Sequence, residues 1–191
     1  MAIQYEQILS NSYIIKAEDK KYTKKELYDI FIDLLIENNF IIIKSSLPTE
    51  SPIEVIVRDN NENDYRFVVN IRNITGSGWK DKIDIKRVQV INILYSSPEK
   101  IITTNQNQAM FLLGYYNFDN NPIFVAWDFY RYTKHNTNRS CYVTINHLQR
   151  GFENGFYEGV SAQNIIWVFK IQYFSKFVEK YINYFREFRN E

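Results

Sequence analysis

Two stretches of the chain combine cationic, amide and aromatic side chains in a way that suits contact with a nucleic acid. The first runs from residue 70 to residue 90 and contains Arg72, Asn73, Trp79, Lys80, Lys82, Lys86, Arg87 and Gln89. Guanidinium and amide groups can hydrogen-bond to base edges in a groove, whereas Lys ammonium groups pair with phosphates. Trp79 follows a Gly-Ser-Gly loop, where it is a candidate for stacking on bases or wedging between them.

The alternative interpretation of this stretch is a solvated hairpin. Asp81 and Asp84 lie among the cations, so the stretch is less positive than its Lys and Arg content alone would make it. Under that interpretation Trp79 folds back as a lid on the core and does not face a duplex.

The second stretch is a predicted loop that contains no acidic residue. Its cationic and amide side chains are Arg131, Lys134, His135, Asn136, Asn138 and Arg139, and no Asp or Glu occurs between residues 129 and 152. The net charge of the whole chain is only +1, so attraction to DNA has to come from such local segregation of charge. If this loop contacts phosphates, its affinity for DNA must fall steeply with salt, because each contact releases counterions.

A metal-dependent nuclease is the first alternative function. Asp84-Ile-Lys86 has the acid-X-Lys spacing of restriction nucleases, and Glu54 or Asp64 could supply the second acid that binds the metal. The Pro-Asp start that accompanies this pattern is absent. The alternative therefore depends on Asp84 and Lys86.

The other reactive side chains do not form a recognisable catalytic or metal-binding set. Cys141 is the only cysteine, which excludes an intramolecular disulfide and a metal site made of several Cys ligands. Cys141 and His147 are the only candidate nucleophile and base, and no elbow motif surrounds them. We therefore expect a binding domain without its own catalytic site, metal or cofactor.

The elements that must position these segments are mostly strands, preceded and followed by a helix. After a predicted solvated linker at 18–21, Thr23 and Glu26 form a capping box, and Leu27 begins an apolar helical stripe that ends before Asn38. Segments rich in Val, Ile, Phe and Tyr predict strands at 13–16, 40–44, 53–58, 65–71, 85–94, 109–115, 123–129, 140–143 and 165–170. A short helix at 146–154, capped by Gly155, and a closing helix at 173–188 complete the prediction.

These elements predict an α+β fold, with a mostly antiparallel curved sheet or open β-pseudobarrel flanked by N-terminal and C-terminal helices. Polar runs at 59–64 and 117–122 predict hairpin loops, which join antiparallel neighbours. We expect one domain over residues 1–191, excised from or acting with a larger protein, because the closing helix has no stop signal. The chain shows neither a signal peptide nor an apolar run of ~20 residues, so we expect it in the cytoplasm.

A protein-interaction domain is the second alternative function. Aromatic residues make up 17% of the chain, and those that the core does not need are available for stacking or for a partner surface. Salt-insensitive self-association without DNA binding would indicate such an aromatic docking surface.

The order of several short motifs resembles that of small domains that accompany restriction–modification systems. The matching residues are Asn73-Ile-Thr75, Asp84, Arg87, Gln89-Val90, Leu112–Tyr116, Phe124–Asp128 and the segment from Ser140 onward, roughly residues 67–157 in all. The resemblance is to DNA-recognition or effector domains, either McrB-like or methylase-associated. It implies double-stranded DNA as the ligand and a nuclease, GTPase or methylase as the partner domain or subunit.

The resemblance also implies the open β-pseudobarrel and, in members that read methylated sites, a flipped base. Ring-lined space near Tyr115, Tyr116 and Trp127 is then the candidate base pocket, and unstacking the base costs roughly a few kcal/mol. The predicted N-terminal and C-terminal helices are not part of the pattern.

Overall fold

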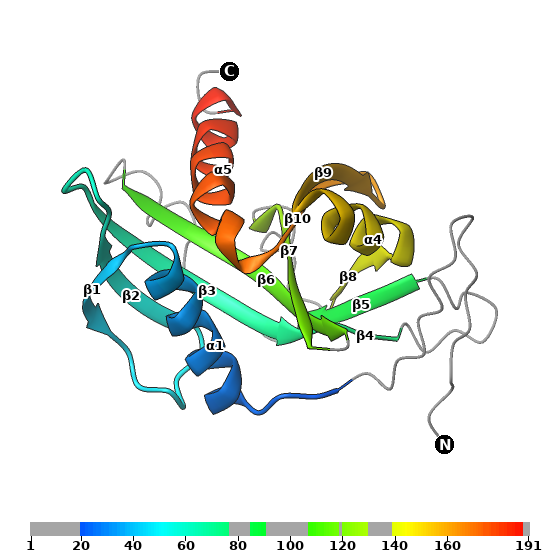
Figure 1. Ribbon diagram of the computed structural model, residues 1–191, viewed down its shortest axis with the longest axis horizontal. Helices are drawn as coiled ribbons and strands as arrows, with labels where there is room; N and C mark the ends of the chain where they lie inside the picture. The colour runs from blue at the N-terminus through cyan, green and yellow to red at the C-terminus, as the bar shows by residue number, and fades with distance from the viewer. Residues whose placement is uncertain (1–19, 77–84, 91–106, 119, 130–138, 189–191) are drawn as a thin grey trace.

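The computed structural model describes residues 20–76, 85–90, 107–118, 120–129 and 139–188 of the 191-residue chain. These residues form three layers (Figure 1): two helices, a seven-stranded mixed sheet, and a small three-stranded sheet with a third helix. The helices are α1 (Lys24–Glu37), α4 (Ile145–Asn154) and α5 (Phe174–Phe188), with a short 3₁₀ turn, η1 (Ile171–Tyr173), before α5. Helices α1 and α5 cover one face of the large sheet, and the small sheet and α4 cover the other.

The seven-stranded sheet has the order β1-β2-β3-β6-β7-β10-β9. Its strands are β1 (Ile41–Ser45), β2 (Ile53–Arg58), β3 (Asp64–Asn73), β6 (Gln108–Phe118), β7 (Asn121–Trp127), β9 (Phe156–Ser161) and β10 (Asn164–Phe169). Strands β3 and β6 are parallel, whereas the other neighbours in this sheet are antiparallel. The small sheet is antiparallel and contains β4 (Thr75–Gly76), β5 (Ile85–Val90) and β8 (Arg139–Thr144), in the order β4-β5-β8.

Each central strand of the large sheet contributes to two hydrophobic cores, because successive side chains of a strand point to opposite faces. On β6, Phe111 and Leu113 pack in the core beneath α1 and α5, whereas Met110 and Leu112 pack in the core shared with the small sheet and α4. Strand β2 has only one covered face, and its side chains alternate between buried and exposed. The burial pattern of a strand therefore tells whether one or both faces of the sheet are covered there.

Helix α1 begins and ends at side-chain hydrogen bonds. Thr23 Oγ1 accepts a hydrogen bond from the Glu26 backbone N–H at 3.2 Å, and Glu26 Oε2 accepts one from the Thr23 N–H at 2.7 Å. At the other end, Asn38 Nδ2 donates to the carbonyls of Leu34 and Ile171, which ties α1 to η1. The predicted capping box and helix are confirmed.

Helix α5 closes the first core with aromatic side chains. Phe174, Phe177 and Tyr181 are buried and contact the ring of Phe111, with centroids between 5.1 and 6.0 Å apart. The Tyr181 hydroxyl donates to the Met110 carbonyl at 2.6 Å. Much of the aromatic content is therefore core. In the described part of the chain, no helix combines the length and the apolar character that a membrane span needs.

The predicted α+β class and the mostly antiparallel sheet with flanking helices are confirmed, and the described residues contain no closed barrel. Strand β9, the parallel β3–β6 pair and the division into two sheets are absent from the sequence prediction. Short loops favour antiparallel pairing, but β3 and β6 are connected through β4 and β5, so that rule does not apply to them. The predicted strand at 13–16 and the end of the predicted strand 85–94 lie outside the described residues.

Gly114 on β6 lies where Ile74 and Trp127 meet, and the packing leaves no room for a side chain. A Cβ at this position would lie 2.6 Å from Ile74 Cγ1 and 2.8 Å from Trp127 Cη2. We predict that Gly114→Ala lowers the free energy of unfolding by about 1–3 kcal/mol, because buried neighbours must shift to admit the methyl group. Urea unfolding measures the loss.

Gly159→Ala is the matched control for this prediction. A Cβ at Gly159 would meet the ring of Tyr157, whose Cε1 lies 2.6 Å away. That side chain is only partly buried and can swing aside, so the loss of stability should be smaller. Equal losses for the two variants would contradict the packing argument.

Candidate nucleic-acid interface

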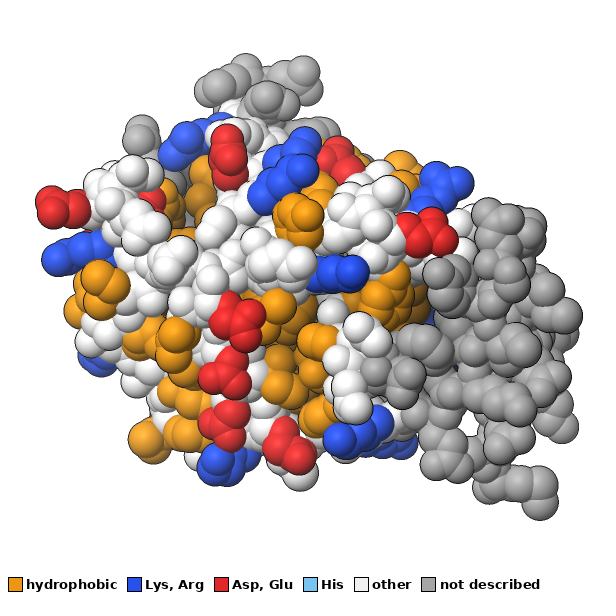
Figure 2. All heavy atoms as spheres, viewed as in Figure 1, with side chains coloured by type: hydrophobic (Ala, Val, Ile, Leu, Met, Phe, Trp, Pro, Cys, Tyr) orange, Lys and Arg blue, Asp and Glu red, His pale blue; other side chains and the backbone are white. Residues whose placement is uncertain are grey.

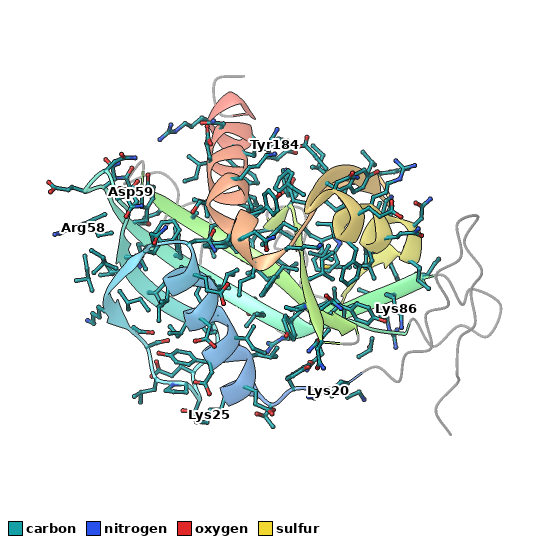
Figure 3. All side chains as sticks on the ribbon, viewed as in Figure 1. Lys20, Lys25, Arg58, Asp59, Lys86 and Tyr184 are labelled. Carbon is teal, nitrogen blue, oxygen red and sulfur yellow. The ribbon has the colours of Figure 1, made fainter. Side chains whose placement is uncertain are left out.

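Four cationic side chains gather where α1 begins, and we call them the basic cluster. Lys20, Lys21 and Lys24 are exposed, and Arg72 on β3 is half-buried. Lys24 and Arg72 line the same small hollow, and Arg72 Nη2 donates to Ser51 Oγ at 3.5 Å. Figure 3 shows Lys20 toward the end of the molecule where β4 and β5 lie.

Tyr22 anchors the basic cluster to the large sheet. Its N–H donates to Asn73 Oδ1 at 2.9 Å, and its carbonyl accepts from Asn73 Nδ2 at 2.8 Å. Its hydroxyl accepts a hydrogen bond from Asn117 Nδ2 at 2.9 Å, and its ring contacts Tyr115 edge to face at a centroid distance of 5.0 Å. The Lys20 ammonium lies 4.9 Å from the centre of the Tyr22 ring. The backbone from which these lysines project is therefore held in a fixed position.

The position of Asn73 changes the role that the sequence predicts for it. The prediction is a contact between its amide and DNA. In the structure, that amide donates to and accepts from the backbone of Tyr22, as a neighbouring strand would. Asn73 is therefore a positioning residue for the basic cluster.

The small sheet presents a row of three polar side chains, Thr75, Arg87 and Tyr142, which we call the outer row. The strand register aligns them, since Arg87 pairs with Thr75 on β4 and with Tyr142 on β8. They lie on the face away from the core, because the alternate residues Val88 and Cys141 are buried. Arg87 Nε is buried and has no hydrogen-bond partner among the described residues, so only the outer part of the guanidinium could meet a ligand.

Lys86 is adjacent to Arg87 but lies on the opposite face of β5. Its side chain is only 1% exposed, and its ammonium lies 5.2 Å from the centre of the Tyr116 ring, between the two sheets. A phosphate cannot reach it there. The predicted phosphate contact by Lys86 is therefore corrected, because the alternation of the strand places this cation in the interior.

The three rings predicted to form a base pocket are not brought together. Tyr115 and Tyr116 are neighbours on β6 and lie on opposite faces of the large sheet. Trp127 packs in the same core as Tyr116, and its indole N–H donates to the Tyr142 carbonyl at 3.0 Å. All three rings are buried. They hold the layers together, so the predicted pocket is corrected.

The acids considered for nuclease chemistry lie apart from Lys86. Glu54 on β2 and Asp64 on β3 form ion pairs of 2.7 and 2.6 Å with arginines of the neighbouring strands. Both acids belong to the large sheet, whereas Lys86 belongs to the small sheet. Asp84 lies outside the described residues. Within the described part, no three His, Cys, Asp or Glu side chains are grouped so that they could hold a metal ion.

Several predicted DNA contacts lie outside the described residues: Trp79, Lys80, Lys82, Arg131, Lys134, His135 and Asn136. Gln89 and Arg139 have a defined place in the strand register, where they pair with Ser140 and Val90. Residues 77–84 connect β4 to β5, and residues 130–138 lead into β8. Both predicted segments are therefore attached to the small sheet.

The sequence prediction missed the three lysines of the basic cluster and Tyr142. Lys20 and Lys21 belong to the segment interpreted as a solvated linker. The available signal was a pair of lysines directly before Tyr22 and the helix cap. For Tyr142 no local signal exists, because its role depends on its register with Arg87.

A comparison with protein families places the chain among modules that are associated with restriction–modification systems. More particularly, residues 65–178 match the Methylase-associated X1 family. The match covers more than half of the chain, and the chain belongs to this family. The resemblance inferred from the sequence motifs is thereby confirmed. Comparisons with curated proteins and with solved structures gave no match.

His147 completes a second capping box, at the start of α4. Its backbone N–H donates to Thr144 Oγ1 at 3.3 Å, and its Nδ1 accepts from the Thr144 N–H at 3.5 Å. Accepting that bond requires an unprotonated Nδ1. Burial, and to a lesser extent the charge of Arg150, lowers the pKa of His147. The neutral ring is therefore the form that the fold favours.

We predict that acidification destabilises the protein through His147. The folded state binds this proton less readily than the unfolded state, in which the pKa of His is about 6.5. The contribution is therefore complete above that pH and is lost as the pH falls below it. His147→Gln should flatten this part of the stability profile, which urea unfolding between about pH 7.5 and pH 5 measures. An unchanged slope in the variant would contradict the assignment.

Proposed function

We propose that the chain binds double-stranded DNA as the recognition module of a restriction–modification system. The observation that carries the proposal is that the basic cluster and the outer row stand on elements that follow one another directly in the chain. Arg72 on β3 and Thr75 on β4 are nearly adjacent in the chain, so the segment 72–76 joins the two sets. Together they provide cations, a guanidinium and an aromatic ring on connected elements.

The two sets suit different parts of a duplex. Lys20, Lys21 and Lys24 are exposed cations, which are suited to phosphates and to setting the orientation of the protein. Arg87 and Tyr142 are held side by side by the register of β5 and β8. A guanidinium and a ring in fixed positions are suited to base edges and to stacking.

The loop segments predicted from the sequence extend this proposal. Because residues 77–84 and 130–138 are attached to the small sheet, Trp79, Lys80 and Lys82 and the cations from Arg131 to Arg139 remain proposed DNA contacts. A methylase, nuclease or GTPase of the same system is the proposed partner, and family membership favours the methylase. Binding experiments should therefore first compare methylated with unmethylated duplexes.

The basic cluster should account for much of the salt dependence of DNA binding. We predict that Lys20→Ala/Lys21→Ala weakens binding to every duplex and reduces the slope of log affinity against log salt by about 2, since ~0.9 counterions leave with each phosphate contact. Fluorescence anisotropy of labelled duplexes, methylated and unmethylated, at low and physiological salt measures both quantities.

The matched control is Lys176→Ala/Lys180→Ala, which removes two exposed lysines from α5. This variant should keep nearly the affinity and the salt slope of the natural chain. If the two double variants reduce the affinity and the salt slope equally, binding is due to nonspecific electrostatic attraction and not to the basic cluster. Absence of binding even at low salt would refute the proposal.

Arg87 tests whether the outer row reads sequence. Arg87→Ala should cost ~1–3 kcal/mol on the preferred duplex and relax the preference at one base pair, if the guanidinium bonds to a base edge. Competition anisotropy with a panel of duplexes measures this, and thermal unfolding of the variant controls for lost packing on β5. A uniform loss across all duplexes would assign Arg87 to a phosphate instead.

A further inference from the structure

The exposed large hydrophobic side chains are concentrated in one part of the molecule. Of the six in the described residues, only Val160 lies elsewhere; the other five, which we call the apolar edge, are Ile36, Ile41, Ile43, Leu47 and Ile56. They are between 36% and 65% exposed. Single exposed apolar residues are ordinary, but a group of them marks an interaction surface.

The apolar edge continues from α1 onto an edge strand of the large sheet. Strand β1 is the first of the seven strands and pairs with β2 alone. The Tyr28 hydroxyl of α1 lies 2.8 Å from Ser45 Oγ of β1, so this side of the helix faces the strand. Ile32 and Ile36 follow Tyr28 at intervals of one helical turn and lie on the same side. Ile41 pairs with the exposed Arg58, and Ile56 alternates with the buried Val55 and Val57, so both lie on the face of the sheet away from α1. The apolar edge therefore extends from α1 around the free edge of β1.

An acidic stripe runs along α1 beside the apolar edge. It consists of Glu26, Asp29, Asp33 and Glu37, which are exposed and share one side of the helix because of their spacing. Figure 2 shows acidic side chains in a column over α1, with hydrophobic side chains next to it toward β1. Asp29 pairs with Lys25 at 2.7 Å, whereas no ion pair within the described residues involves Asp33 or Glu37.

This surface lies outside the part of the chain that the family model matches. The match begins at residue 65, and both the apolar edge and the acidic stripe precede that residue. The matched part carries the outer row and Arg72. The chain thus adds to the family module a layer whose surface has a different chemical character from that of the basic cluster.

We propose that the apolar edge and the acidic stripe dock a basic amphipathic segment of a partner protein. Apolar side chains of the segment cover Ile36, Ile41 and Ile43, and its Lys or Arg residues pair with Asp33 and Glu37. Carboxylates repel the phosphates of DNA, which excludes a duplex as the occupant. A two-fold pair of this chain would bring like patches, and therefore like charges, together. The inference does not depend on DNA binding.

The probe for this surface is a labelled synthetic amphipathic peptide of Leu and Lys, with a Leu and Glu peptide of the same pattern as its counterpart. The full chain should bind the basic peptide and not the acidic one. Asp33→Lys/Glu37→Lys and Ile36→Ser/Ile41→Ser should each weaken binding about tenfold or more, the equivalent of ~1.4 kcal/mol. Fluorescence anisotropy measures the affinities, and circular dichroism confirms that the variants are folded.

Glu153→Lys/Glu179→Lys and Val160→Ser are the matched controls, because they change exposed acids and an exposed apolar residue on other elements. They should leave the affinity unchanged. Equal weakening by the controls, or equal binding of the acidic peptide, would overturn the proposal. Sedimentation of the chain alone gives a further test. Self-association that Ile36→Ser/Ile41→Ser abolishes would assign the surface to a second copy and also overturn it.

Discussion

Burial of both faces of the large sheet is the constraint on which the structure depends. Strands β3, β6, β7 and β10 supply side chains in alternation to two separate cores, and a shift of one residue in any of them would exchange the two sets. The layers approach closely at glycines. At Gly151 of α4, for example, a Cβ would lie 2.4 Å from Val168 Cγ1 of β10. Helix, sheet and small sheet are thereby held at fixed separations, and the surface residues take their positions from that frame.

The same alternation separates interior from surface on the small sheet. Lys86 and Arg87 are consecutive cations, yet one lies beneath Tyr116 and the other faces outward beside Tyr142. Helix α1 divides charge in another way, with lysines around its start and carboxylates along its exposed side. A polyanion and a basic protein segment can therefore approach the same helix from different directions. Because this chain is nearly neutral, its charged residues are informative only when their positions on the surface are known.

Local signals in the sequence predict the elements well where each element carries its own information. The Thr23–Glu26 capping box and the stripe from Leu27 predict α1, and the alternation of residues 53–58 predicts β2 with its observed bounds. Strand β9 contains Gly159 and Glu158 and lacks a run of β-branched residues, so its identity depends on pairing with β10.

The candidate site is less predictable, because it is made of contacts between distant residues. Tyr22 and Asn73 are 51 positions apart, and their hydrogen bonds help to bring Lys20 and Arg72 to the same end of the molecule. The burial of Lys86 depends on Tyr116, a residue of another sheet. Charge density along the chain indicates where a cation occurs in the sequence, but it does not indicate which face of a strand the cation occupies.

The parallel pairing of β3 with β6 has a consequence for how the chain folds during synthesis. Arg66 pairs with Gln108, and the chain between them makes β4 and β5, whose sheet is completed only by β8. Neither sheet can therefore close from consecutive residues, and such non-local pairing slows folding. Helix α1 and strands β1 to β3 are the first described elements to be made, but β6 and α5 are needed to complete their core. The nascent chain must keep that apolar face from aggregating until α5 has emerged from the ribosome.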